Sequence, residues 1–167
     1  MKMSLHTSCY THFFIKDYCA LIDYFADLGY DALDLEIIKS YPGTEDHLLL
    51  SETEWLPFAE KVKAKMEERH MFFGQAHAPI VAYLETATEE DKRQLRQCIK
   101  VCHFFGIHAL TVHLLHVKDA SPEEFRQKNL AFFREFFPML DEYDVDFCFE
   151  NYGYWNEPDC HCFSADE

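Results

Sequence analysis

Three apolar stretches of this sequence each end near a side chain that can bind a metal ion or move a proton. Residues 147–151 place Glu150 and Asn151 where a short buried strand gives way to a Tyr-Gly-Tyr segment. His77 closes a second apolar run, and His113 lies in a third. In parallel α/β architectures the chemistry lies at the C-terminal ends of the strands. The pattern therefore predicts that three strands deliver one potential metal ligand each to the same edge.

Each of these residues also has a purely structural interpretation. A strand-end carboxylate such as Glu150 can form a salt bridge, although its position before an asparagine in a barrel-like pattern favours function. His77 precedes an Ala-Pro pair that ends the strand stiffly. For His77 and for His113, a core histidine hydrogen-bonded to backbone is the alternative to a ligand.

Further polar residues are candidates for contacts with a substrate. The strand expected at 32–37 alternates so that Asp34 and Glu36 share one face, which brings two carboxylates to its far end. These two carboxylates can either line a pocket or form a structural salt bridge, and the sequence leaves both interpretations open. His6 flanks the first strand–helix connection, where its functional interpretation is a substrate contact.

The composition is typical of one globular domain with an excess of negative charge, which repels anionic partners. The chain has 167 residues, of which 49% are hydrophobic, and its net charge is −15. This charge argues against partnership with nucleic acid or acidic membranes. We expect a cytoplasmic protein with no membrane contact, because no stretch has the length of a signal peptide core or a membrane span. The seven cysteines are then reduced thiols.

Apolar periodicity, capping motifs and glycines divide the chain into alternating strands and helices. We expect strands at 3–8 and 32–37, one that ends at His77, and others at 109–115 and 147–151. Helices are expected at 17–28, from a capping box at 51–54 to about 69, at 88–105, and from a capping box at 121–124 to about 140. This alternation predicts an α/β fold with a parallel sheet and right-handed crossovers.

With these signals in place, the chain resembles the xylose isomerase-like TIM barrels, which include sugar phosphate isomerases and epimerases and the type IV apurinic endonucleases. The resemblance rests on the Leu-Gly-Tyr-Asp-Ala-Leu-Asp-Leu segment at 28–35, the His-Ala-Pro segment at 77–79, His113, and the pair Glu150 and Asn151. A (β/α)8 barrel needs about 250 residues, or roughly 31 per unit. We therefore expect a partial TIM (β/α)8 barrel of about five parallel βα units.

The expected domain spans residues 1–167 and is incomplete at its C-terminus. A Ser-Ala-Asp-Glu capping box at 164–167 opens a helix that has no body in this sequence. A helix without a body buries nothing, so the chain is interpreted as a truncated version of a longer design. A barrel opened after its fifth strand leaves unpaired edges and uncovered apolar side chains, which predicts self-association.

The resemblance also implies a metal centre. In the family a glutamate at the end of the fifth strand binds a divalent metal, with further Asp, His and Glu ligands from the last three strands. Glu150 corresponds to the first ligand, and the others have no counterpart here. In the endonuclease branch the histidines after the third and fourth strands bind zinc, and these correspond to His77 and His113. Mn²⁺, Mg²⁺, Co²⁺ or Zn²⁺ is thus expected to bind weakly or not at all.

The activity that the resemblance implies is isomerisation or epimerisation of a small sugar or sugar phosphate, impaired by the truncation. Glu150 would ligate the metal and exchange a proton beside the carbonyl, while His77 and His113 bind metal or orient hydroxyl groups. Asn151 and Trp155 would contact the substrate, the tryptophan as an apolar wall against a sugar ring.

Two alternatives remain open. One is zinc-dependent cleavage of abasic DNA through His77, His113 and Glu150, against which the strand-end loops offer few lysines or arginines. The other is a non-catalytic fragment or binding module that lacks the catalytic half.

Overall fold

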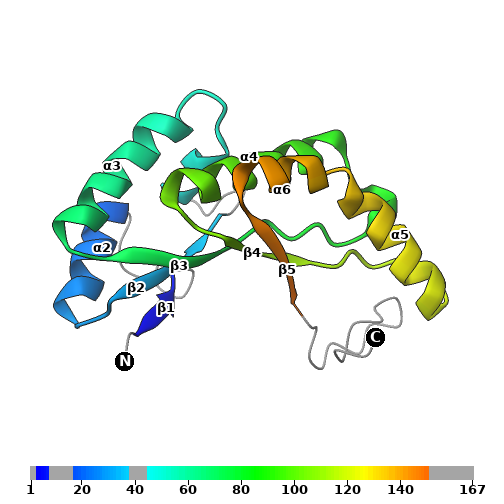
Figure 1. The fold of residues 1–167 in the computed structure, drawn as a ribbon, viewed down its shortest axis with the longest axis horizontal. Coiled ribbons are helices and arrows are strands. Elements are labelled where there is room, and N and C mark those ends of the chain that lie inside the picture. Colours follow the sequence, from blue (N-terminus) through cyan, green and yellow to red (C-terminus); the bar gives the residue numbers. More distant parts are fainter. Residues whose placement is uncertain (1–2, 8–16, 38–44, 151–167) are drawn as a thin grey trace.

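The structure of the chain is a computed structural model that describes residues 3–7, 17–37 and 45–150. Five strands form one sheet, in which they are arranged in chain order and pair in parallel (Figure 1). Their bounds are β1 Ser4–His6, β2 Ala32–Glu36, β3 Phe72–His77, β4 Ala109–His113 and β5 Asp146–Glu150. The predicted α/β fold with five parallel strands is confirmed.

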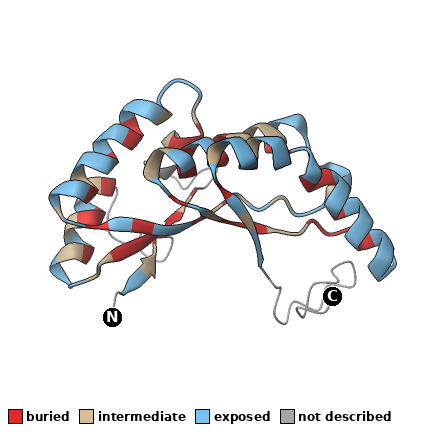
Figure 2. Cartoon of the chain, viewed as in Figure 1, coloured by how far each residue is buried: buried red, intermediate tan, exposed pale blue. Residues whose placement is uncertain are grey.

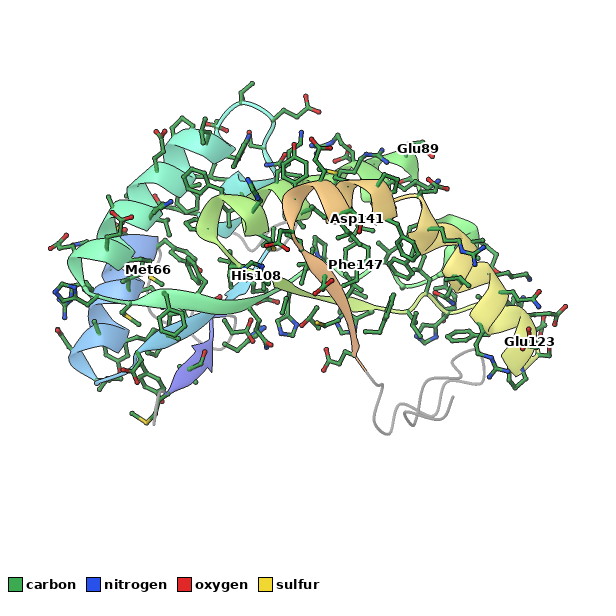
Figure 3. All side chains as sticks on the ribbon, in the orientation of Figure 1. Met66, Glu89, His108, Glu123, Asp141 and Phe147 are labelled. Carbon is green, nitrogen blue, oxygen red and sulfur yellow. The ribbon has the colours of Figure 1, made fainter. Side chains whose placement is uncertain are left out.

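The helices lie along one side of this twisted sheet (Figure 1). Their bounds are α2 Tyr18–Asp27, η1 Asp46–Leu50, α3 Trp55–Glu68, η2 Leu84–Thr86, α4 Glu89–Phe105, α5 Pro122–Arg134 and α6 Phe137–Tyr143. Side chains fill the space between the helices and the sheet (Figure 3). No helix in the described part of the chain is long and apolar enough to cross a membrane.

The sheet face that meets the helices is apolar. Buried residues follow the strands and the inner sides of the helices, whereas the outer sides of the helices are exposed (Figure 2). Leu33 and Leu110 are fully buried on this face, and the rings of Phe147 and Phe149 pack against Phe133 of α5. Alternation along each strand sends the intervening residues to the opposite face, where the polar side chains gather.

The prediction that a helix starts at the capping box 51–54 was wrong by one turn. The Glu54 N–H donates to Ser51 Oγ at 3.2 Å, but residues 52–54 form a turn and α3 begins at Trp55. Pro57 explains the later start. A start at residue 52 would place Pro57 beyond the first turn, where a backbone N–H is needed, whereas a start at Trp55 keeps it within that turn.

The single helix predicted from the capping box at 121–124 to about 140 is two helices. Its start is confirmed, since the Ser121 and Glu124 side chains each accept from the other's backbone N–H. The break lies at Pro138, which has no N–H and whose ring crowds the carbonyl four residues earlier. That carbonyl belongs to Arg134, where α5 ends. The predicted strands at 3–8 and 109–115 are also shorter in the structure, which ends them at His6 and His113.

A buried asparagine fixes the chain just beyond β4. Asn129 of α5 is buried, its Oδ1 accepts from the Leu115 N–H at 2.8 Å, and its Nδ2 donates to the Leu115 carbonyl at 2.9 Å. Nδ2 also lies 3.1 Å from the Phe125 carbonyl. The amide therefore satisfies both backbone groups of Leu115, two residues after His113.

We expect Asn129→Ala to lower the free energy of unfolding by about 2–4 kcal/mol, because it leaves two buried backbone groups unpaired. Urea denaturation followed by circular dichroism measures this change. Gln127→Ala is the matched control, since Gln127 lies on the same helix but bonds only an exposed Glu123. Equal, small losses in both variants would contradict a structural role for Asn129.

Candidate strand-end site

Every strand of the sheet ends on a histidine or a glutamate. These last residues are His6, Glu36, His77, His113 and Glu150. The strands run parallel, so all five residues lie at the same edge, and the register sets Glu36 beside His77 and His113 beside Glu150. All five are among the residues that the sequence marks as candidates. We refer to this edge as the strand-end site.

His77, His113 and Glu150 come together across the three neighbouring strands β3, β4 and β5. Each offers one ligand atom, and the three atoms lie within 4.8 Å of one another. His113 Nε2 is 3.6 Å from Glu150 Oε2. The side chain of Glu150 is 49% exposed, which leaves its carboxylate accessible from solvent.

A second set, His6, Asp34 and His77, meets the same distance limit and shares His77 with the first. His77 Nε2 is 3.2 Å from Asp34 Oδ2, and Gln75 Nε2 donates to the same oxygen at 2.5 Å. The His6 ring meets the His77 ring edge-on, with centroids 4.6 Å apart. Beside this set lies a cavity of about 430 Å³ lined by Leu5, His6, Asp34, Gly74 and other residues of β1 and β3.

A β-bulge at Gly74 brings His77 to this face of the sheet. Leu33 pairs with Phe73, but the next residue, Asp34, pairs with Gln75, so Gly74 is the extra residue. A one-residue shift exchanges the faces of every side chain that follows. Phe73 therefore faces the helices with Leu33, while Gln75 and His77 face the site with Asp34. Sequence reasoning missed Gln75 and the bulge, although a lone glycine inside a strand is a signal for one.

Two carboxylate oxygens at this edge have unused capacity as acceptors. Asp34 is only 7% exposed, and its Oδ1 finds no hydrogen-bond partner in the described part of the chain. The same holds for Oε2 of Glu36. Buried acceptors of this kind call for a cation or a donor group. Asn151 and Trp155, the other predicted substrate contacts, lie outside the described residues.

The two histidines of the first set have opposite electrostatic environments. The hydrogen bond that the His77 ring donates to Asp34 raises the pKa of His77, against the effect of burial, and the carboxylates of Glu150 and Glu36 add to the rise. Burial lowers the pKa of His113, and the attraction of Glu150 only partly offsets it. The lowered pKa of His113 favours the neutral imidazole, which is the form that binds a metal ion.

The residues present fit a divalent cation. Two imidazoles and one carboxylate are the kind of donor set that holds zinc in open catalytic sites, with a further position left for water or substrate. Such a site needs the His77 ring neutral at the ligating nitrogen. Asp34 Oδ2, 3.2 Å from His77 Nε2, is a hydrogen-bond partner of the kind that orients a ligating imidazole.

Comparison with protein families identifies the family that shares this fold. The family model of the xylose isomerase-like TIM barrel matches residues 22–167. The chain belongs to this family. The five-stranded sheet is accordingly a partial TIM barrel, as the sequence predicted. No curated protein matches this chain in sequence.

Several solved structures share the fold at low sequence identity. A D-tagatose 3-epimerase-like protein superposes with a TM-score of 0.66 and 15% identity over 93% of this chain. The 3-keto-D-glucoside 4-epimerase YcjR from E. coli gives 0.70 and 14% over 95%. An IOLI protein with a bound zinc atom gives 0.66 and 12% over 96%. This chain spans only 55%, 59% and 54% of those three chains, respectively.

We expect His77 to titrate above the ordinary histidine pKa of 6.5, and His113 below it. Protonation of His77 then stabilises the fold below about pH 6.5, and this contribution is lost as the pH rises through its raised pKa. The contribution of His113 is present above about pH 6.5 and is lost as the pH falls through its lowered pKa. NMR titration of the imidazole carbons in the presence of a chelator measures both.

Asp34→Asn should lower the pKa of His77 and leave that of His113 nearly unchanged, because the hydrogen bond is the largest cause of the first shift. Asp141→Asn, on the exposed side of α6, is the control for loss of one negative charge. An unchanged pKa of His77 in Asp34→Asn would show that Asp34 does not set it.

Proposed function

We propose that the strand-end site binds a divalent cation together with a small sugar-like hydroxy-carbonyl compound, and moves a proton beside the carbonyl. The observation that carries this proposal is the convergence of His77, His113 and Glu150 within 4.8 Å at the C-terminal strand edge. The proposal is supported by the family and by the sugar epimerases among the proteins with the same fold. The activity is that of a sugar isomerase or epimerase.

Glu150 is the residue that we assign to proton transfer. It is the last residue of β5, its side chain is half exposed, and a carboxylate can both accept and return a proton. His113 Nε2 lies 3.6 Å from Glu150 Oε2, close enough for both residues to contact one bound ligand.

His77 and Asp34 orient the substrate end of the site. Asp34 is buried and accepts from both Gln75 and His77, which fixes the imidazole ring in one orientation. A carboxylate bonded to one imidazole nitrogen also makes the ring a better ligand or hydrogen-bond partner at the other. In this role His77 binds a hydroxyl group or the cation, and Asn151 and Trp155 complete the substrate contacts.

The cation that this donor set suits best is zinc. When bound, a divalent cation polarises the carbonyl and the neighbouring hydroxyl, which lowers the barrier to removing the proton between them. Three protein ligands are enough for an open zinc site, whereas Mg²⁺ and similar hard cations prefer six oxygen donors and bind here more weakly. Mn²⁺ and Co²⁺ accept mixed nitrogen and oxygen ligands and are the next candidates.

Zinc-dependent cleavage of abasic DNA is the second candidate, because the same His77, His113 and Glu150 set is what that reaction would use. The net charge of −15 opposes it, since DNA binding needs cations that reach phosphates. Fluorescence anisotropy with an abasic duplex at low salt separates the two candidates. Tight, salt-sensitive binding would reverse their order.

We also propose that the chain self-associates through its β5 edge. Among the described residues β5 pairs only with β4, and exposed apolar side chains lie beside it. Leu130, Phe137 and Phe149 border an apolar cavity of about 230 Å³ between α5 and the edge. An unpaired strand flanked by exposed apolar groups favours pairing with a second copy.

We expect Glu150→Gln to weaken zinc binding by about a hundredfold, because it removes the charged ligand from a set of three. Calorimetry with Zn²⁺ measures the affinity, and Glu142→Gln, an exposed glutamate of α6, is the control. Unchanged affinity in Glu150→Gln would remove Glu150 from the site.

The same proteins test the reaction through solvent deuterium incorporation into a panel of ketoses. Incorporation by the zinc-loaded wild-type chain, absent in Glu150→Gln and kept in Glu142→Gln, supports the isomerase assignment. Zinc binding without incorporation into any ketose is the outcome that favours a binding module.

Sedimentation at micromolar concentration should show dimers or larger species of the wild-type chain. We expect Leu130→Ser to shift the population toward monomer, because it removes apolar surface at the β5 edge. Leu56→Ser is the matched control, since both leucines lie on helices and are 44% and 41% exposed. A monomeric wild-type chain, or equal effects of the two substitutions, would contradict association through this edge.

A further inference from the structure

A groove on the helix side of the fold collects positive charge in an otherwise acidic protein. Its floor is one side of α4, formed by Arg93, Arg96, Gln97 and Lys100, and its cavity is about 380 Å³. These positions are spaced i, i+3, i+4 and i+7, which places them on one helix face. We call it the α4 groove. None of its residues belongs to the strand-end site.

Two apolar side chains wall the α4 groove. Trp55 stands at the start of α3, and Met139 comes from α6, which packs beside α4. The Trp55 ring meets Phe104 edge-on, with centroids 6.0 Å apart, so its orientation is set by a neighbour within the fold. A flat apolar surface is thereby held next to the positive floor.

Gln97 is the residue in the groove that points to a ligand. Its side chain is 6% exposed, and its buried Nε2 has no hydrogen-bond partner in the described part of the chain. Buried amide groups nearly always have a partner, so an unpaired donor needs an explanation. Since Nε2 is a donor, what it lacks is an acceptor, and because the atom itself is buried the amide must turn toward the groove to meet an anionic oxygen there.

Two of the three cations retain donors for the same acceptor. The Lys100 ammonium forms no hydrogen bond or ion pair with another residue in the described ranges. Arg96 reaches Glu89 only at 4.0 Å, and its guanidinium lies 5.9 Å from the centre of the Phe136 ring. Their charges are therefore not neutralised by close carboxylates.

Arg93 serves the groove differently. Its guanidinium donates to both oxygens of Glu90 at 2.7 Å, and its Nη1 lies 3.6 Å from Glu52, the one carboxylate that lines the groove. Arg93 is thus occupied with holding these acids, and it offsets the negative charge of Glu52 at the rim. Arg96, Gln97 and Lys100 are left to face the cavity.

We propose that the α4 groove binds a small organic anion, a phosphate or carboxylate group carried on a flat apolar body. Arg96, Lys100 and the Gln97 amide hold the anionic oxygens, and Trp55 packs against the apolar body. Charge-assisted hydrogen bonds to arginine and lysine give the affinity, and the tryptophan face gives preference for a planar ligand. The ligand of the α4 groove is a second ligand of the protein, separate from any sugar or metal at the strand ends.

The chain contains two tryptophans, so Trp155→Phe leaves Trp55 as the only fluorescent indole. In that background we expect phenyl phosphate to produce a saturable change in Trp55 emission. Arg96→Ala and Gln97→Leu should each weaken binding by about tenfold or more, since each removes a hydrogen bond to a charged group. Lys100→Glu, at an exposed position of α4, should abolish it because it reverses the charge in the groove.

The matched controls are Arg134→Ala and Lys128→Glu on α5, which change the same charges away from the groove. If the control variants lose as much affinity for phenyl phosphate as the groove variants, the binding reflects general attraction between ions, and the proposed site is overturned. A fluorescence signal that never saturates would overturn it as well. Inorganic phosphate and benzoate separate the parts of the ligand. Phosphate binding as tightly as phenyl phosphate would overturn the role of Trp55, and benzoate binding as tightly would identify a carboxylate as sufficient.

Zinc calorimetry on Lys100→Glu keeps this proposal distinct from the proposed function. We expect its zinc affinity to equal that of the wild-type chain, because the α4 groove and the strand-end site share no residue. Circular dichroism of Lys100→Glu confirms that the variant is folded, and a loss of zinc affinity together with phenyl phosphate binding in the folded variant would overturn an independent site.

Discussion

The β-bulge at Gly74 is the constraint on which the strand-end site depends. Without the bulge, regular alternation through Gly74 would keep Gln75 and His77 on the same face as Phe73, among the apolar side chains that meet the helices. With it, His77 faces Asp34 and His6 on one side, and His113 and Glu150 on the other. One residue without a side chain therefore joins the first two strands of the sheet to the last two in a single site.

His77 and His113 show how position alone does not determine what a residue does. Both are the last residues of neighbouring parallel strands, and both are partly buried. A carboxylate at hydrogen-bonding distance raises the pKa of His77, whereas burial prevails at His113, where Glu150 is farther away and more exposed. One imidazole is thus oriented and inclined to hold a proton, and the other is kept neutral, within one cluster.

The position of these residues at the strand ends could be predicted from the sequence because it follows from two local rules. Alternation along a strand sets the face of Asp34 and Glu36, and parallel strands bring their last residues to one edge. Gln75 escaped prediction because its face depends on a bulge, which is a property of the pairing with β2. The break at Pro138 was predictable from that proline alone, whereas the unpaired amide of Gln97 depends on which helices pack around α4.

The site is held firmly at one end and loosely at the other. β3 lies between β2 and β4, and the carbonyl of His77 accepts from the Ile37 N–H while the next residue, Ala78, donates to Thr111, both at 2.9 Å. Its backbone is therefore fixed from both sides. Glu150 ends a strand that pairs on one side only among the described residues, and its side chain is half exposed.

A rigid strand suits a residue that must orient a ligand, because small displacements weaken binding and catalysis. A more exposed carboxylate with room to adjust suits the residue that exchanges a proton, since it must meet the substrate in two protonation states. The division of roles that we propose for His77 and Glu150 thus agrees with where their strands lie in the sheet.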